Sequence, residues 1–293
     1  GVEAALDSVL RGKDGSRPMR LIEHNEWIPD VEETEIPPQD GLDVQVTLDV
    51  NIQDIAEKAL LRRISGESDL EAGCAIVMET ATGAIKAISN LRRDPASPAN
   101  YSESMEYALN ATVEPGSTFK LASLLAYLEK VPDDTAGRYE INRHTFQFET
   151  KSGRKLTYTK TDHNVEPIKV SALEVFKRSS NVGIAQMIFE AYGTHGFPRY
   201  YAQLKKFGLT DTLHSQLGDI APARIKDGTN DFNTYYATCF GAGFNIPIIR
   251  TLVYYNAIAN KGRMMAPQIV RYVTDTYDTV RRFEPEVLMD SIA

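Results

Sequence analysis

The sequence predicts an α+β fold, because strand-like segments come early in the chain and helical periodicity dominates after about residue 160. Strands followed by helices, rather than alternating with them, are typical of this class. The chain has 293 residues, of which 42% are hydrophobic and 25% are charged. This length and composition suit one large domain or two smaller ones.

The first forty residues are polar and are punctuated by a Pro-Pro and an Asp-Gly pair at positions 37–41. Such pairs indicate a boundary or a rigid turn. We interpret residues 1–40 as the end of a preceding domain with its linker, and residues 41–293 as the main domain. The chain begins at Gly1 without a methionine, so we expect it to be a fragment of a longer protein.

The main domain should begin with a strand and a helix. Residues 43–50 alternate like a strand, and residues 51–64 carry apolar side chains at helical spacing, with Asn51 as the expected N-cap. Residues 74–89 predict two strands joined by a tight turn at Thr82-Gly83.

The later segments predict a second hairpin and several helices. Residues 144–160 form the hairpin, with its tip at positions 151–153. Residues 170–193 predict two apolar-faced helices interrupted at positions 179–181, and residues 250–262 predict another helix closed by its last glycine.

The most informative segment is EPGSTFKLASLLAYLE, residues 114–129. Its first three residues predict a turn, and the run that Ser117 opens is apolar around most of its circumference, which predicts a buried helix. Lys120 lies on the first turn of this helix. A buried lysine is rare unless a function requires it.

The spacing of Ser117 and Lys120 predicts a nucleophile with its base. Residues three apart share one helix face, at about 5–6 Å between Cβ atoms. A serine hydroxyl needs a base to become a nucleophile, and burial lowers the pKa of a lysine so that it can accept the proton. The helix dipole at Ser117 also favours a developing negative charge. The alternative is a helix cap beside a lysine that extends to solvent.

Two further patterns bear on this interpretation. Ser152 and Lys155 repeat the spacing, but they fall in a polar hairpin tip that cannot hold the pair on one buried face, so we assign them no function. Ser179-Ser180-Asn181 interrupts a helical stretch and supplies two hydroxyls and an amide. Its alternative interpretation is a helix end followed by an asparagine cap.

Several functional classes have no support in the sequence. The formal net charge of −8 argues against a nucleic-acid partner. The two cysteines form no C-x-x-C pair, the five histidines form no ligand pattern, and no phosphate-binding glycine motif occurs, so we expect no metal and no cofactor. No apolar run approaches the roughly 18 residues of a membrane span.

EPGSTFK followed by RSSN resembles the penicillin-binding transpeptidases, and the class B type in particular. Other similar stretches are GVEAALDSVLRGKDG (the end of the class B pedestal domain), VTLDVNIQDIAEKAL (the entry into the transpeptidase domain), METATGAIKAISN (its first hairpin), and FGAGF and YYNAIANKGR (its later helices). The resemblance covers essentially the whole chain and is greatest to the division (septal) type. It implies a serine β-lactamase-like α+β fold.

The resemblance also implies a role for each site residue. Ser117 corresponds to the acyl nucleophile that attacks the D-Ala-D-Ala bond of a peptidoglycan stem peptide, and Lys120 to its general base. Ser179 corresponds to the group that passes a proton to the departing amine. Asn181 corresponds to the residue that binds the substrate backbone and helps to position Lys120.

The implied partners are peptidoglycan stem peptides, β-lactam antibiotics, a septal glycosyltransferase and other divisome proteins. The implied location is the outer, periplasmic face of the cytoplasmic membrane, with the anchor outside this chain. Two other functions remain open: a serine β-lactamase, which would deacylate quickly, and a penicillin sensor or scaffold without turnover.

The chain departs from the family at the third motif, K-[ST]-G, which should follow Ser179. The one match, at positions 151–153, precedes Ser179 and is rejected on order. We therefore expect either that a second segment completes the fold or that the chain is truncated before that motif, with an incomplete sheet whose first hairpin exposes an apolar face and edge. The expected transpeptidase activity is accordingly that of the parent protein, and the activity of this chain alone stays open. The motif supplies one oxyanion-hole amide, and losing one such donor costs about 10²–10³ in rate.

Overall fold

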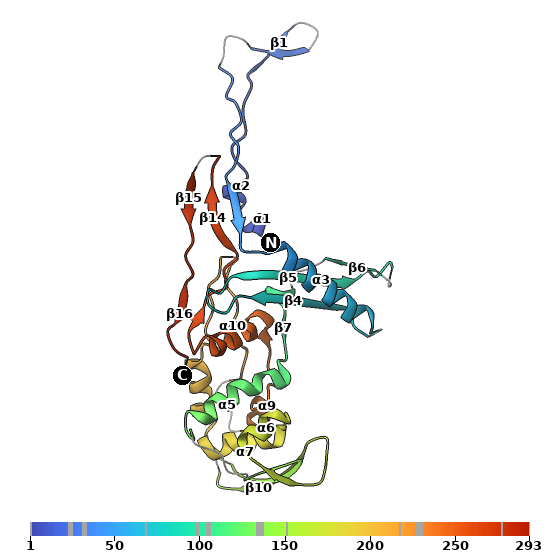
Figure 1. Cartoon of the computed structure of the whole chain (residues 1–293), viewed down its shortest axis with the longest axis vertical. Helices are drawn as coiled ribbons and strands as arrows, with labels where there is room; N and C mark the ends of the chain where they lie inside the picture. The colour runs from blue at the N-terminus through green and yellow to red at the C-terminus, as the bar shows by residue number, and fades with distance from the viewer. Residues whose placement is uncertain are drawn as a thin grey trace.

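The computed structural model of the chain describes residues 2–22, 26–30, 34–67, 69–97, 100–103, 107–132, 138–150, 152–216, 218–226, 231–276 and 278–292. The molecule is elongated (Figure 1). A two-stranded arm projects at one end, a sheet covered by a helix lies in the middle, and a lobe of helices leads to a hairpin at the other end. This mixture of elements confirms the predicted α+β class.

The arm comes from the first forty residues. Its elements are α1 (Val2–Ala5), α2 (Asp7–Leu10), β1 (Met19–Ile22) and β2 (Glu26–Pro29). β1 and β2 pair antiparallel. The predicted boundary at 37–41 lies where the arm returns to α2. A Cβ atom on Gly41 would lie 1.9 Å from the carbonyl oxygen of Leu10, so the close approach of these two segments requires glycine.

The predicted strand after the arm is β3 (Asp43–Val46), and it pairs with β14 (Val270–Thr274) near the other end of the chain. The helix that follows is α3 (Val50–Ser65). Its N-cap is Asp49 and not Asn51, because the Asp49 carboxylate accepts hydrogen bonds from the N–H groups of Asn51 and Ile52. An aspartate satisfies these orphan amides as well as an asparagine does.

The helix α3 packs on a three-stranded antiparallel sheet, in the order β4-β5-β6. The bounds are β4 (Ala72–Met78), β5 (Ile85–Arg93) and β6 (Tyr101–Glu103). The predicted turn at 82–83 is confirmed, with Gly83 at φ 79°. Among the described residues β4 pairs only with β5, so its other edge lacks a partner strand. Its side chains are mostly half-buried, and only Val77 is exposed.

The helical lobe carries most of the core. Its first elements are α4 (Tyr107–Asn110), β7 (Thr112–Val113), the 3₁₀ turn η2 (Gly116–Phe119), α5 (Lys120–Leu128), β8 (Tyr139–Ile141), β9 (Arg143–Glu149), β10 (Lys155–Thr161) and β11 (Ile168–Val170). It continues through α6 (Ala172–Lys177), α7 (Asn181–Tyr192), α8 (Phe197–Lys206), α9 (Phe232–Thr238), β12 (Ile246–Pro247) and α10 (Ile248–Ala259). The last strands of the chain are β13 (Met264–Met265), β14, β15 (Thr279–Arg282) and β16 (Val287–Met289). Of these, β14 and β15 form a sheet with β3.

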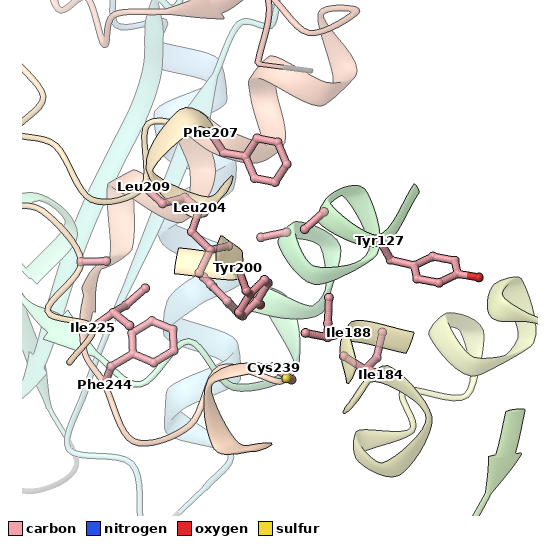
Figure 2. Packing of buried hydrophobic residues seen from close by; sticks show 14 of the residues in the cluster. Tyr127, Ile184, Ile188, Tyr200, Leu204, Phe207, Leu209, Ile225, Cys239 and Phe244 are labelled. Atoms are coloured by element: carbon pink, nitrogen blue, oxygen red, sulfur yellow. The ribbon is translucent and has the colours of Figure 1, made fainter. Parts of the chain in front are cut away.

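Apolar faces of α5, α7 and α8 meet in this core (Figure 2). The hairpin β9–β10 is anchored to it by aromatic contacts, such as the stacked rings of Tyr158 and Phe232, 4.0 Å apart. The prediction of two helices interrupted at 179–181 is confirmed by α6 and α7. The helix α10 ends at Ala259, so Gly262 belongs to the following turn.

The hairpin tip predicted at 151–153 is also present, although Lys151 lies outside the described residues. Within the described part of the chain, no helix has the length and apolar character that crossing a bilayer requires.

Candidate active site

Ser117 and Lys120 lie at the junction of η2 and α5. The backbone N–H of Lys120 donates to the carbonyl of Ser117, which closes a 3₁₀ turn. In a 3₁₀ helix, side chains three residues apart are eclipsed, so the serine lies directly beside the lysine. Ser117 is exposed, whereas Lys120 is the first residue of the buried helix α5. The sequence predicted one continuous helix here, and the tighter first turn brings the pair closer.

The Lys120 ammonium is surrounded by three oxygen atoms. Its Nζ lies 3.1 Å from Oγ of Ser117 and 3.0 Å from Oγ of Ser179, and it also donates to the carbonyl oxygen of Ser179. The residue is 1% exposed. Burial lowers the pKa of Lys120 to about 8, while the charge of Asp162 acts in the opposite direction. About one lysine in ten is therefore neutral at pH 7.

Ser179 reaches Lys120 because of an unusual backbone conformation. The N–H of Ser179 donates to the carbonyl of Phe176, and the N–H of Ser180 donates to that of Val175. These two bonds form a Schellman motif at the end of α6, and its left-handed position is usually glycine. Ser179 occupies that position with φ 53°. A side chain there costs about 1–2 kcal/mol, which indicates that the hydroxyl has a use.

Asn181 is the first residue of α7, and the N-cap of this helix is Ser180, whose hydroxyl accepts a hydrogen bond from Gly183. The alternative interpretation of Asn181 as a cap is therefore wrong. Its side chain lines the same cavity as Ser117 and Ser179. In the described part of the chain it makes no hydrogen bond to Lys120, so its help in positioning the lysine stays a prediction.

Asp162 is a site residue that the sequence reasoning missed. It follows β10, and its carboxylate accepts hydrogen bonds from the Ser180 hydroxyl and from the N–H groups of Asn181 and Val182. A single carboxylate in a polar loop carries no spacing signal, because only the fold brings β10 beside the start of α7.

The turn that carries Ser117 is held from its other side by the segment FGAGF. The N–H of Gly116 donates to the carbonyl of Gly241, and the Glu114 carboxylate accepts from the N–H of Gly243. A Cβ atom on Gly241 would lie 2.2 Å from the carbonyl oxygen of Gly116. Glycine is therefore required at 241 for the nucleophile turn to keep this position.

A cavity of about 350 Å³ opens in front of the serine. The residues around it are almost all polar: Ser117, Ile141, Asn142, Thr161, Asp162, His163, Asn164, Arg178, Ser179, Ser180 and Asn181. Such a lining suits a polar, peptide-like ligand. No cluster of three potential metal-binding side chains occurs among the residues that the structure describes.

The second pair at the same spacing is arranged differently. Ser152 lies in the tip of the β9–β10 hairpin and Lys155 is the first residue of β10, and both are exposed. Lys120 is a candidate base because it is buried and contacts hydroxyl groups. Lys155 is exposed, and no contact with a hydroxyl is among its described contacts.

Comparison with known proteins gives a family. The model of the penicillin binding protein transpeptidase domain matches residues 73–290. The chain is 27% identical to stage V sporulation protein D of Bacillus subtilis, over 97% of this chain and 44% of that protein. It is also 27% identical to the probable peptidoglycan D,D-transpeptidase FtsI of Caulobacter vibrioides, over 77% of this chain and 36% of that protein.

Among solved structures, penicillin-binding protein 3 of Mycobacterium tuberculosis, complexed with aztreonam, has a TM-score of 0.72 at 22% identity. The match covers 100% of this chain and 60% of that one. The likeness shows that the two chains share a fold. The present chain spans less than half the length of both curated relatives.

Proposed function

Because the chain belongs to the penicillin-binding protein transpeptidase family, we propose that the protein is a class B peptidoglycan D,D-transpeptidase that works through a serine acyl-enzyme. The observation that carries this proposal is the buried Lys120 Nζ, 3.1 Å from the Ser117 hydroxyl and 3.0 Å from the Ser179 hydroxyl. A lysine with a pKa of about 8 in that place is a competent general base at neutral pH.

In the first half of the proposed reaction, neutral Lys120 takes the hydroxyl proton while Oγ of Ser117 attacks the carbonyl carbon of the D-Ala-D-Ala bond. The carbon–nitrogen bond then breaks. The departing D-alanine amine receives a proton from the Ser179 hydroxyl. The Lys120 ammonium then gives a proton to the oxygen of Ser179. The product is an ester between Ser117 and the remaining stem peptide.

In the second half, the amine of a neighbouring stem peptide attacks this ester. The amine loses a proton to Lys120 through Ser179, and Lys120 gives a proton to the departing Oγ of Ser117 as the cross-link forms. Asn181 would bind the peptide backbone of the donor, and its place in the lining of the cavity supports this role. A β-lactam is attacked by the same oxygen, but its amide lies in a ring, so no leaving group departs and the ester persists.

The proposal extends to the setting of the reaction. Residues 1–40 would end a pedestal-like domain, and residues 41–293 would belong to the transpeptidase domain. Stem peptides lie outside the cytoplasmic membrane, so the site would act on its outer, periplasmic face. The resemblance of the sequence motifs extends the proposal to a division type, with a septal glycosyltransferase and divisome proteins as partners.

Intact-mass spectrometry after incubation with benzylpenicillin tests the role of Ser117. The wild-type chain should gain the mass of one drug molecule, and Ser117→Ala should gain none. If neither the wild-type chain nor a chain extended at its C-terminus gains mass, the proposal is overturned.

The lifetime of the adduct separates the alternatives. A transpeptidase keeps the adduct for hours, whereas rapid loss with accumulation of hydrolysed drug indicates a β-lactamase. A second incubation supplies a donor pentapeptide and an amine acceptor. A stable penicillin adduct without cross-linked product indicates a sensor.

A further inference from the structure

The carboxylate of Asp162 joins three separate segments of the chain. Its Oδ1 accepts from the N–H groups of Asn181 at 2.9 Å and Val182 at 3.1 Å, at the start of α7. Its Oδ2 accepts from the Ser180 hydroxyl at 2.5 Å and from the N–H of Asn142 at 3.2 Å, between β8 and β9. Two oxygen atoms with four donors leave the side chain a single orientation.

The segments that Asp162 joins contain two strained residues. Asn142 has φ 71° and Ser179 has φ 53°, and among the described non-glycine residues only Lys261 shares this left-handed conformation. Asp162 also donates its own N–H to the carbonyl of Asn142, at 2.7 Å. Backbone strain of this kind persists only where neighbouring contacts over-determine it. The carboxylate supplies such contacts on both sides.

We propose that Asp162 is a positioning residue for the acylation of Ser117. It holds the start of α7 against the end of β10, and thereby fixes Ser179 where the serine carbonyl and hydroxyl both meet Nζ of Lys120. No described hydrogen bond links Asp162 to Ser117 or Lys120 directly. The inference rests on the proposed function, since it concerns the acylation of Ser117 with Lys120 as its base.

The charge of Asp162 gives the proposal a second, independent consequence. It raises the pKa of Lys120 against the effect of burial. The groups hydrogen-bonded to Nζ are two hydroxyls and a carbonyl, which carry no charge. His163 and Arg178 are the remaining ionisable side chains around the cavity. Removing the carboxylate charge should therefore lower the lysine pKa further.

Two substitutions separate the contacts that Asp162 makes. In Asp162→Asn, the amide oxygen can still accept from the N–H groups at the start of α7, but the amide nitrogen faces the N–H of Asn142 and cannot accept from it. Asp162→Ala removes all four bonds. Both substitutions remove the charge.

Asp49→Asn is a matched control, because Asp49 also accepts two backbone N–H groups at the start of a helix. That helix, α3, lies on the sheet, in another part of the molecule (Figure 1).

The rate of acylation by a fluorescent penicillin, measured against pH, is the first readout. We expect Asp162→Asn to lower the plateau rate by about 10- to 100-fold, Asp162→Ala to lower it further, and Asp49→Asn to leave it unchanged. A plateau unchanged in Asp162→Asn would overturn the proposal.

The second readout does not require acylation. The pKa of Lys120 is measured from the pH dependence of its ¹³Cε NMR signal, assigned with Lys120→Arg. In Asp162→Asn the lysine pKa should fall below the wild-type value. If Asp162 merely maintained the fold, loosening of the site would expose the lysine and move its pKa up towards the ordinary 10.5.

An unchanged or raised pKa therefore contradicts the positioning role. If neither the wild-type chain nor the extended chain is acylated, the proposed function fails, and the NMR titration still decides whether Asp162 holds Ser179 against a buried Lys120.

Discussion

Lys120 and Arg250 are two cations buried to the same extent, each 1% exposed, yet their partners differ in kind. The lysine meets two serine hydroxyls and one carbonyl. The arginine, on α10, donates to three backbone carbonyls, those of Gly208, Ile220 and Ala221. Neither cation has a carboxylate in contact among the described residues, although such a partner is the usual way to stabilise a buried charge.

The difference in partners decides whether the buried cation can act as a base. Burial lowers the pKa of Lys120 to about 8 and that of Arg250 to about 10. The arginine stays charged at neutral pH and fixes three loop carbonyls, which can only accept. About one lysine in ten is neutral at pH 7, and a hydroxyl beside it can give up a proton. A buried cationic residue can therefore act as a general base only where the group beside it can donate a proton.

The largest effect that tests this contrast is the loss of the base. Lys120→Met should lower the rate of Ser117 acylation by about 10²–10⁴-fold, the range that general bases contribute. The same substitution should change the free energy of unfolding by no more than about 1 kcal/mol, because methionine fills the space without a charge. Acylation is followed with a fluorescent penicillin, and stability by urea denaturation.

Lys155→Met is the control for this variant, because Lys155 also follows a serine by three residues but is exposed. It should acylate at the wild-type rate. Equal losses in the two lysine variants would show that spacing matters and burial does not.

The next largest effect concerns stability. Arg250→Met leaves the buried Gly208 carbonyl without its donor, whereas the Ile220 carbonyl still accepts from the N–H of Leu213 and Ala221 is exposed. An unsatisfied buried polar group costs about 1–3 kcal/mol, so we expect the free energy of unfolding to fall by about that amount. Arg263→Met, at an exposed arginine just after α10, should leave it unchanged. If Arg250→Met denatures at the wild-type urea concentration, the structural role assigned to this cation is wrong.

The smallest effect is the pH dependence of acylation in the wild-type chain. Neutral Lys120 is the active form, so the rate should rise with pH and level off above the lysine pKa of about 8. Below pH 7 it should fall about tenfold for each pH unit. Arg250 keeps its proton throughout this range and adds no inflection. A pH–rate profile without a midpoint between about pH 7 and 9 would show that Lys120 does not accept the proton.

Local patterns in the sequence predicted much of this molecule. The turn at Thr82-Gly83 and the interruption at 179–181 were placed correctly, because turn chemistry and helix ends depend on neighbouring residues. Caps were less certain. Asp49 and Ser180 cap the helices for which Asn51 and Asn181 were considered, since several adjacent polar side chains can satisfy the same amides.

Arg250 is also a single cation inside an apolar segment, IPIIRTLVYY, so its sequence context predicts burial as that of Lys120 does. No serine precedes the arginine at helical spacing, so the pattern predicts no catalytic base there. A cationic residue in an apolar helix is predicted to be buried. Its hydrogen-bond partners decide whether it is a base or a structural cation.

The sequence by itself determined the α+β class, the pairing of Ser117 with Lys120 and the position of the Ser179 loop, because these depend on spacing along one or two turns. Only the tertiary structure decided that Asp162 meets the start of α7 and that the glycine at 241 supports the nucleophile turn. These contacts join residues 18 to 125 positions apart in the printed sequence. No local pattern encodes such distances, since they arise only when separate elements pack on one core.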